Sequence, residues 1–179
     1  IACPPLKAYA SKLWDYYVRK LDPAVDKFGA LRKEVEGKVV VVTGSSDGIG
    51  EVLARRVAKA GGKVVLVARS KEKLEVVQKS IQASGGIAAI QPADLSDGDS
   101  TNKAAAEILK THGRVDILVS NAGRSIRRSV EYECTPDRFH DFTRTMELNY
   151  YGALRMTLAF LPGMRERKFG QVINVSSIG

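Results

Sequence analysis

From Gly37 onward, short apolar runs alternate with segments of helical periodicity, and this alternation constrains the fold more than any other feature. The first run, KVVVVT at 38–43, is apolar almost throughout, as expected of a parallel strand that is covered on both faces. Four similar runs predict strands at 63–68, 86–91, 115–120 and 171–176. Helices are predicted after the glycine-rich turn, on the stretch with Leu74, Val77 and Ile81, at 98–112, and at about 136–162, ending near Pro162-Gly163.

This alternation predicts the class and topology of the fold. Strands and helices joined by right-handed crossovers form a doubly wound parallel sheet with helices on both faces. The Rossmann-type sheet, which binds dinucleotides, has the strand order 3-2-1-4-5-6. We therefore expect an α/β fold with a Rossmann-type doubly wound parallel sheet, in which five strands are present and the C-terminal strands are missing.

Residues 1–36 have a different pattern. Leu13, Tyr17 and Leu21 lie at helical spacing, and Asp22-Pro23 ends this amphipathic stretch. The charged connector KFGALRKEVEGK follows. We expect 1–36 to form a helical arm and linker rather than a core element, and 37–179 to form the nucleotide-binding domain. A further domain N-terminal to residue 1 stays an open alternative.

The net charge of +8 indicates anionic partners. Basic residues are scattered and carry no nucleic-acid-binding signature, so phosphorylated small molecules are favoured over nucleic acid. The cluster of Arg124, Arg127 and Arg128 either contacts such a ligand or forms a solvated basic face. Cys3 and Cys134 lack metal-ligand and redox spacing, and no secretory or membrane-spanning segment is evident. We expect a cytoplasmic protein without a metal site, and homo-oligomerisation stays open.

The strongest local signal is VVVVTGSSDGIG, in which Gly44, Gly48 and Gly50 separate a buried strand from a helix. Glycines let a backbone turn sharply and approach a pyrophosphate, to which the helix N-terminus offers free N–H groups. Asp47 is expected to cap this helix. The turn therefore predicts a phosphate-binding site for a dinucleotide.

The spacing Thr43-Gly44-x-x-x-Gly48-Ile49-Gly50 resembles the fingerprint of the short-chain dehydrogenase/reductase family. Further motifs of that family are matched in order by ADL at 93–95, NAG at 121–123, LNYYG at 148–152 and VINVSSIG at 172–179. The resemblance covers residues 37–179. It implies a Rossmann-type fold, a nicotinamide cofactor and hydride transfer to or from a carbonyl carbon.

The resemblance also implies which residues contact the cofactor. Asp94 and Leu95 would bind the adenine ring, and Gly123 would leave room for a ribose. Asn121 is expected to tie strand ends together through its amide. The complete set of expected cofactor-binding residues is Gly44, Ser45, Ser46, Gly48, Ile49, Gly50, Arg69, Ser70, Asp94, Leu95, Asn121, Ala122 and Gly123.

The end of the second strand favours NADP over NAD as the cofactor. NAD enzymes carry an acidic residue there for the ribose 2′-OH, whereas this chain has Arg69 and Ser70. The guanidinium can bind a 2′-phosphate through charge-assisted hydrogen bonds. NADP-preferring family members often have a second basic residue in the glycine turn, but this turn holds Ser45, Ser46 and Asp47.

Two residues are expected to act in catalysis. The resemblance implies that Ser177 hydrogen-bonds the substrate carbonyl and that Asn149 holds a water of a proton relay. Asparagine is a poor helix former, and such a local conflict is typical of a functional position. The Tyr and Lys pair that the resemblance implies would fall after Gly179, so residues 1–179 alone are expected to bind cofactor without turnover.

A narrower likeness concerns the substrate. NAGRSIRRSVEYE at 121–133 and the stretch 139–170 are similar to bacterial fatty acyl-CoA reductases that carry a short-chain-dehydrogenase domain. This implies NADPH-dependent reduction of a carbonyl or thioester, in a fatty acyl-CoA or fatty aldehyde. The alternatives are a generic short-chain reductase for a ketone, alcohol or 3-oxoacyl thioester, and a non-catalytic dinucleotide-binding module.

Overall fold

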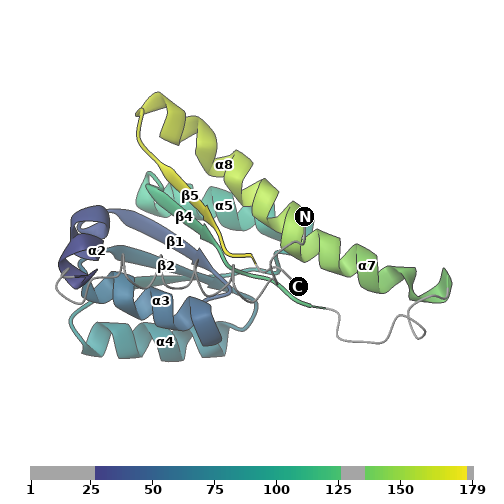
Figure 1. Ribbon diagram of the computed structural model, residues 1–179, viewed down its shortest axis with the longest axis horizontal. Helices are drawn as coiled ribbons and strands as arrows, with labels where there is room; N and C mark the ends of the chain where they lie inside the picture. Colours follow the sequence, from purple (N-terminus) through teal and green to yellow (C-terminus); the bar gives the residue numbers. More distant parts are fainter. Residues whose placement is uncertain (1–26, 126–135, 177–179) are drawn as a thin grey trace, which may run out of the picture.

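A computed structural model describes residues 27–125 and 136–176 (Figure 1). Its five strands are all parallel and lie in the order β3-β2-β1-β4-β5. The strands are β1 (Val39–Thr43), β2 (Lys63–Ala68), β3 (Ile87–Pro92), β4 (Ile117–Ser120) and β5 (Gln171–Asn174). The predicted doubly wound Rossmann-type sheet is confirmed, and the strand order reverses between β1 and β4.

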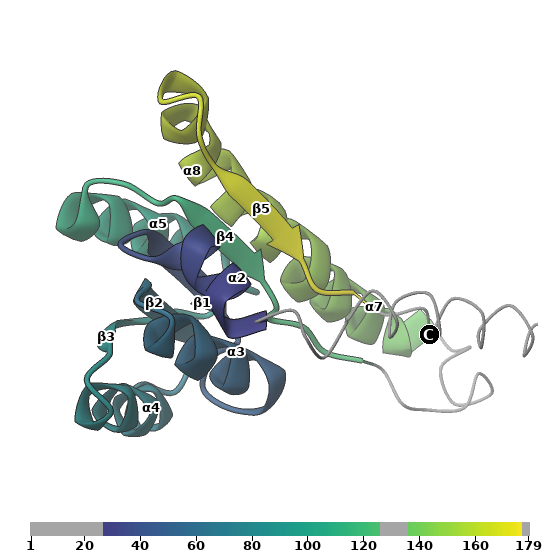
Figure 2. The ribbon, with the colours of Figure 1, turned by 60° about the vertical axis from the view of Figure 1, so that its left-hand side comes forward.

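Helices cover both faces of the sheet, as Figures 1 and 2 show from two directions. One face packs against α2 (Lys27–Val35), α3 (Gly48–Lys59) and α4 (Lys71–Ala83), and the other against α5 (Gly98–His112) and α8 (Ala153–Glu166). Val40 and Val42 of β1 point to the first face, whereas Val39 and Val41 point to the second. All of β1 is buried because it is covered on both sides.

Helix α2 corrects the expectation for the charged connector. Its last residue, Val35, is only 4% exposed and belongs to the core, and Leu31 packs against the same cluster. The backbone then bonds to the loop before β2, with Gly37 N–H donating to the Gly61 carbonyl at 2.9 Å. The end of the connector is therefore a core element, and the prediction of a linker was wrong for these residues.

The expected long helix at about 136–162 is present but subdivided. A short 3-10 turn, η1 (Pro136–Arg138), leads into α7 (Phe139–Met146), a π-helical segment, η2 (Glu147–Gly152), and α8. Helix α8 continues through Pro162 to Glu166, so the predicted end was too early. Met156, Phe160 and Met164 lie along one buried face, and their burial on both sides of the proline favours continuation of the helix.

Strand β5 lies at the edge of the sheet beside α8 (Figure 2). All four of its residues are exposed, in contrast to the buried β1 and β4. Within the described ranges, no helix is long and apolar enough to cross a membrane.

Candidate functional site

A cleft of about 700 Å³ lies at the carboxyl ends of the strands, where the strand order reverses. Open α/β sheets bind their ligands at such a crevice. All expected cofactor-binding residues except Ser45 and Gly50 line it. Its lining also includes five residues that sequence reasoning did not assign to cofactor binding: Asp47, Ala68, Lys73, Ala93 and Leu148.

The glycine turn forms one wall of the cleft. Gly44 and Gly48 adopt positive φ values of 65° and 59°, which L side chains rarely adopt. Gly50 is needed for a different reason, because a Cβ there would lie 2.6 Å from Asn121 Nδ2. The turn is thereby held close to the end of β4.

Asp47 occupies the N-cap position of α3 in an extended conformation, but its side chain makes no cap hydrogen bond to the helix. The carboxylate instead accepts a hydrogen bond from Lys73 Nζ at 3.2 Å. The predicted side-chain cap was therefore wrong. Because the carboxylate makes no cap hydrogen bond, it does not occupy the first N–H groups of α3, which an anion can bind.

A network of hydrogen bonds fixes the turn to the end of β4. The Thr43 hydroxyl accepts from the backbone N–H groups of Asn121 at 2.9 Å and Ala122 at 3.0 Å. Asn121 Nδ2 donates in return to the carbonyl oxygens of Thr43 at 3.0 Å and Gly44 at 3.3 Å. The expected structural role of Asn121, tying two strand ends together, is confirmed.

The end of β2 brings positive charge to the cleft. Arg69 is exposed and lines it, and Ser70 caps α4 by accepting from Lys73 N–H at 3.3 Å. Ser70 also donates to a Glu72 oxygen at 2.9 Å. Lys73 therefore lies in the first turn of α4, with its ammonium directed toward the glycine turn.

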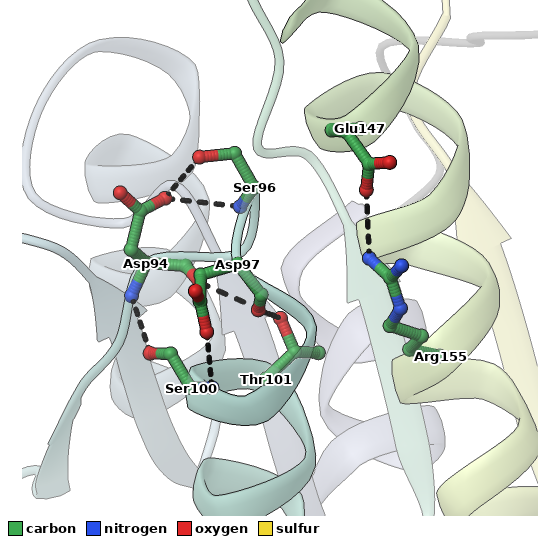
Figure 3. Close-up of polar contacts among 7 residues, drawn as sticks. All are labelled: Asp94, Ser96, Asp97, Ser100, Thr101, Glu147 and Arg155. Carbon is green, nitrogen blue, oxygen red and sulfur yellow. Dashed lines mark hydrogen bonds and ion pairs between the residues drawn. The ribbon is translucent and has the colours of Figure 1, made fainter. Parts of the chain in front are cut away.

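Hydrogen bonds within its own loop hold Asp94 at the end of β3 (Figure 3). One carboxylate oxygen accepts from Ser96 N–H at 2.9 Å and from Ser96 Oγ at 2.6 Å, and Asp94 N–H donates to Ser100 Oγ at 3.0 Å. Partial desolvation alone would raise the pKa of Asp94, but the Ser96 hydrogen bonds and the charge of Arg69 outweigh it. The pKa of Asp94 therefore lies below its ordinary value, and the side chain is a carboxylate at neutral pH.

Asn149 lies in the π-helical segment, and its side-chain amide forms two hydrogen bonds with the backbone of Arg124. Its Oδ1 accepts from Arg124 N–H at 2.9 Å, and its Nδ2 donates to the Arg124 carbonyl at 2.8 Å. The sequence gives no signal for the π-helix, which places the amide opposite the loop after β4. π-Helical segments are frequent at functional sites.

The π-helical segment also packs against the loop after β3. A Cβ at Gly152 would lie 2.5 Å from the Leu95 carbonyl oxygen, so only glycine lets the two backbones approach this closely. An ion pair between Glu147 Oε2 and Arg155 Nη1 at 3.0 Å spans the segment (Figure 3). The loops after β3 and β4 are thus both fixed by one irregular helix.

Some expected residues cannot be placed in this geometry. Ser177, Arg127 and Arg128, and the amphipathic arm up to residue 26, lie outside the described residues. Among those that are described, no group of three or more His, Cys, Asp or Glu side chains could hold a metal ion.

Comparison with known proteins identifies the family. The profile of the family described as short chain dehydrogenase matches residues 38–179. The chain belongs to the short-chain dehydrogenase family. A solved relative is a metagenomic short-chain oxidoreductase in complex with NADP, with a TM-score of 0.75 and 37% identity, covering 81% of this chain and 64% of that one.

Two curated relatives share the same percentage of identical residues with this chain, over different lengths. An uncharacterized oxidoreductase of Mycobacterium bovis is 51% identical over 173 residues, which are 95% of this chain and 50% of that protein. A fatty acyl-CoA reductase of Acinetobacter baylyi is 51% identical over 148 residues, covering 83% of this chain and 50% of that protein. The chain thus spans about half the length of these curated relatives.

The residues of this short-chain dehydrogenase fit a dinucleotide. The glycine turn and the N-terminus of α3 offer N–H donors for a pyrophosphate, and Arg69 and Lys73 offer cations at the end of β2. Buried in the turn, the Ser45 hydroxyl has no hydrogen-bond partner within the described part of the chain. The donors that line the cleft, backbone N–H groups and two cationic side chains, therefore suit phosphate groups.

Proposed function

We propose that this chain is the NADP-binding part of a reductase that acts on a fatty acyl-CoA or a fatty aldehyde. The observation that supports NADP as the cofactor is the basic end of the cleft, where Arg69 lies next to the cap of α4. The substrate class is supported by 51% identity to the fatty acyl-CoA reductase of Acinetobacter baylyi. Residues 37–179 act as the NADP-binding domain, and the amphipathic residues before them act as its arm.

Each wall of the cleft binds one part of the cofactor. Arg69 pairs with the 2′-phosphate, and Ser70 lies beside it. The glycine turn and the N-terminus of α3 bind the pyrophosphate, where a helix terminus favours anions. Asp94 and Leu95 bind the adenine, since Asp94 keeps a carboxylate at neutral pH.

When bound in the cleft, NADPH would supply the hydride for the carbonyl carbon. The proton for the oxygen would come from the Tyr and Lys pair that the family implies, and a thioester would also release its thiol. Ser177 hydrogen-bonds the carbonyl oxygen, on which negative charge grows. Asn149 acts through position, because both polar groups of its amide bond Arg124 and hold the loop after β4. The family also implies that Asn149 holds a water of the proton relay.

We place this activity in the cytoplasm and assign its partner molecule on chemical grounds. The cytoplasm keeps thiols such as Cys3 and Cys134 reduced. The partner is a small molecule with a carbonyl or thioester, and the net charge of +8 suits one whose carrier is phosphorylated.

The test is NADPH-dependent turnover by the protein that carries this chain, with a fatty acyl-CoA and a fatty aldehyde assayed in parallel. Oxidation of NADPH with either substrate supports the proposal. Turnover of ketones or 3-oxoacyl thioesters alone would assign a generic short-chain reductase, and cofactor binding without turnover of any carbonyl would assign a binding module. In the same protein, Arg69→Ala should lower affinity for NADPH and leave that for NADH unchanged, and an unchanged preference would refute the role of Arg69.

A further inference from the structure

The 2′-phosphate end of the cleft contains an anion that should weaken phosphate binding. Asp47 lies in the glycine turn and lines the cleft, and its side chain is 70% exposed. Its carboxylate would repel a nearby phosphate unless a cation compensates it. The cation that does so is Lys73, whose Nζ lies 3.2 Å from Asp47 Oδ2.

The Asp47–Lys73 pair is easily exchanged. The Lys73 side chain is 61% exposed, and exposed ion pairs contribute little to stability because water screens them. A phosphate dianion attracts an ammonium more strongly than a single carboxylate does. Lys73 can therefore leave Asp47 for a phosphate without disturbing the fold.

The backbone of Lys73 is fixed by the cap of α4, whereas its exposed side chain ends in the ion pair with Asp47. Its N–H donates to the Ser70 hydroxyl, which caps α4 directly after Arg69. Arg69 and Lys73 both line the cleft, and they flank the same helix terminus. An arginine that forms paired hydrogen bonds and a lysine that acts as a point charge are complementary ligands of one phosphate.

We propose that Lys73 is a specificity-determining residue that binds the 2′-phosphate together with Arg69. It replaces the basic residue that the glycine turn lacks, and Asp47 holds its ammonium at the mouth of the cleft until the phosphate arrives. This inference rests on the proposed use of NADP and needs no assumption about the carbonyl substrate.

The experiment measures dissociation constants for NADPH and NADH by fluorescence titration of the protein that carries this chain. Lys73→Ala should weaken NADPH binding about tenfold, as loss of a charged hydrogen bond does, and leave NADH within about twofold. The matched control is Lys71→Ala, in the same helical turn, because Lys71 pairs with Glu75 and does not line the cleft. This control should leave both constants within about twofold. Lys73→Arg should keep the NADPH preference.

A second readout separates the phosphate from the rest of the cofactor. Competition with 2′,5′-ADP and with 5′-AMP tests the 2′-phosphate directly, and only 2′,5′-ADP should bind Lys73→Ala more weakly. Asp47→Asn should strengthen NADPH binding, because it removes the competing carboxylate. Equal losses for NADPH and NADH, or no loss in Lys73→Ala while the wild type prefers NADPH, would overturn the role of Lys73. A wild type without NADPH preference would overturn the cofactor proposal as well, whereas failed acyl-CoA turnover leaves these binding ratios unaffected.

Discussion

Replacing Gly50 with alanine tests the close contact between the glycine turn and the end of β4. The added Cβ would lie 2.6 Å from Asn121 Nδ2 and closer still to the Gly44 carbonyl oxygen, whereas Cβ atoms essentially never lie within 3.0 Å of such neighbours. The neighbours cannot easily yield, because Asn121 Nδ2 already donates to the Thr43 and Gly44 carbonyls. The turn must therefore open by roughly 1 Å, and overpacking of this kind costs about 1–3 kcal/mol.

Opening the turn also stretches the two hydrogen bonds of the Asn121 amide, each of which contributes about 1 kcal/mol. We expect Gly50→Ala to lower the free energy of unfolding by about 3 kcal/mol and the Tm by about 10 °C. NADPH binding should weaken at least about tenfold, because the N-terminus of α3 moves relative to the turn. Thermal melting and fluorescence titration of the protein that carries this chain measure both effects.

The matched control is Gly48, whose requirement is conformational. Its φ is 59°, but a Cβ there would meet no described atom within 4 Å. Gly48→Ala should cost only about 1 kcal/mol, the strain of a left-handed residue, and Gly48→Asn less, because asparagine tolerates this region. At position 50 the order should reverse, with asparagine worse than alanine. A Gly50→Ala protein that melts and binds NADPH as the wild type does would refute this reasoning.

Three further substitutions test other contacts of the fold. Thr43→Val should cost about 2 kcal/mol in urea unfolding, because it leaves two partly buried N–H groups after β4 without their acceptor, while Thr43→Ser should be tolerated. Gly152→Ala should displace the Leu95 loop, which lies 2.5 Å from the new Cβ, and hydrogen exchange over residues 93–100 should accelerate; unchanged exchange would contradict the contact. Burial lowers the pKa of His112 below its ordinary value of 6.5. As the pH falls below 6.5, the unfolded chain therefore takes up this proton more readily than the folded chain, and the free energy of unfolding decreases. His112→Gln should flatten that acid-side decline in Tm, and an identical pH profile would exclude the contribution of His112.

The elements that sequence predicted well are those with a local pattern. The continuous apolar run of β1 and the glycine turn after it determine a strand, a turn and a helix without reference to distant residues. The amide of Asn121 was placed correctly because it directly follows a predicted strand, where it can bond the end of a neighbouring strand.

The features that sequence reasoning missed depend on distant residues. Half of the connector residues before Gly37 are charged, and only the packing of Leu31 and Val35 makes it a core helix. Lys73 lies 26 residues from Asp47 in the chain, so their ion pair, and with it the loss of the expected cap on α3, follows from tertiary structure. The π-helical segment around Asn149 likewise has no periodicity of its own that a sequence pattern can reveal.

The two hydrogen bonds between the Asn149 amide and the backbone of Arg124 affect which residues position 124 can hold. Both hydrogen bonds use main-chain atoms of Arg124, so they form with any residue at that position except proline, which lacks the N–H group. Mutation can therefore change the side chain at this position, which follows the cleft residue Gly123, while the loop keeps its course. Position 124 can therefore vary without a cost to the two hydrogen bonds that hold the loop after β4.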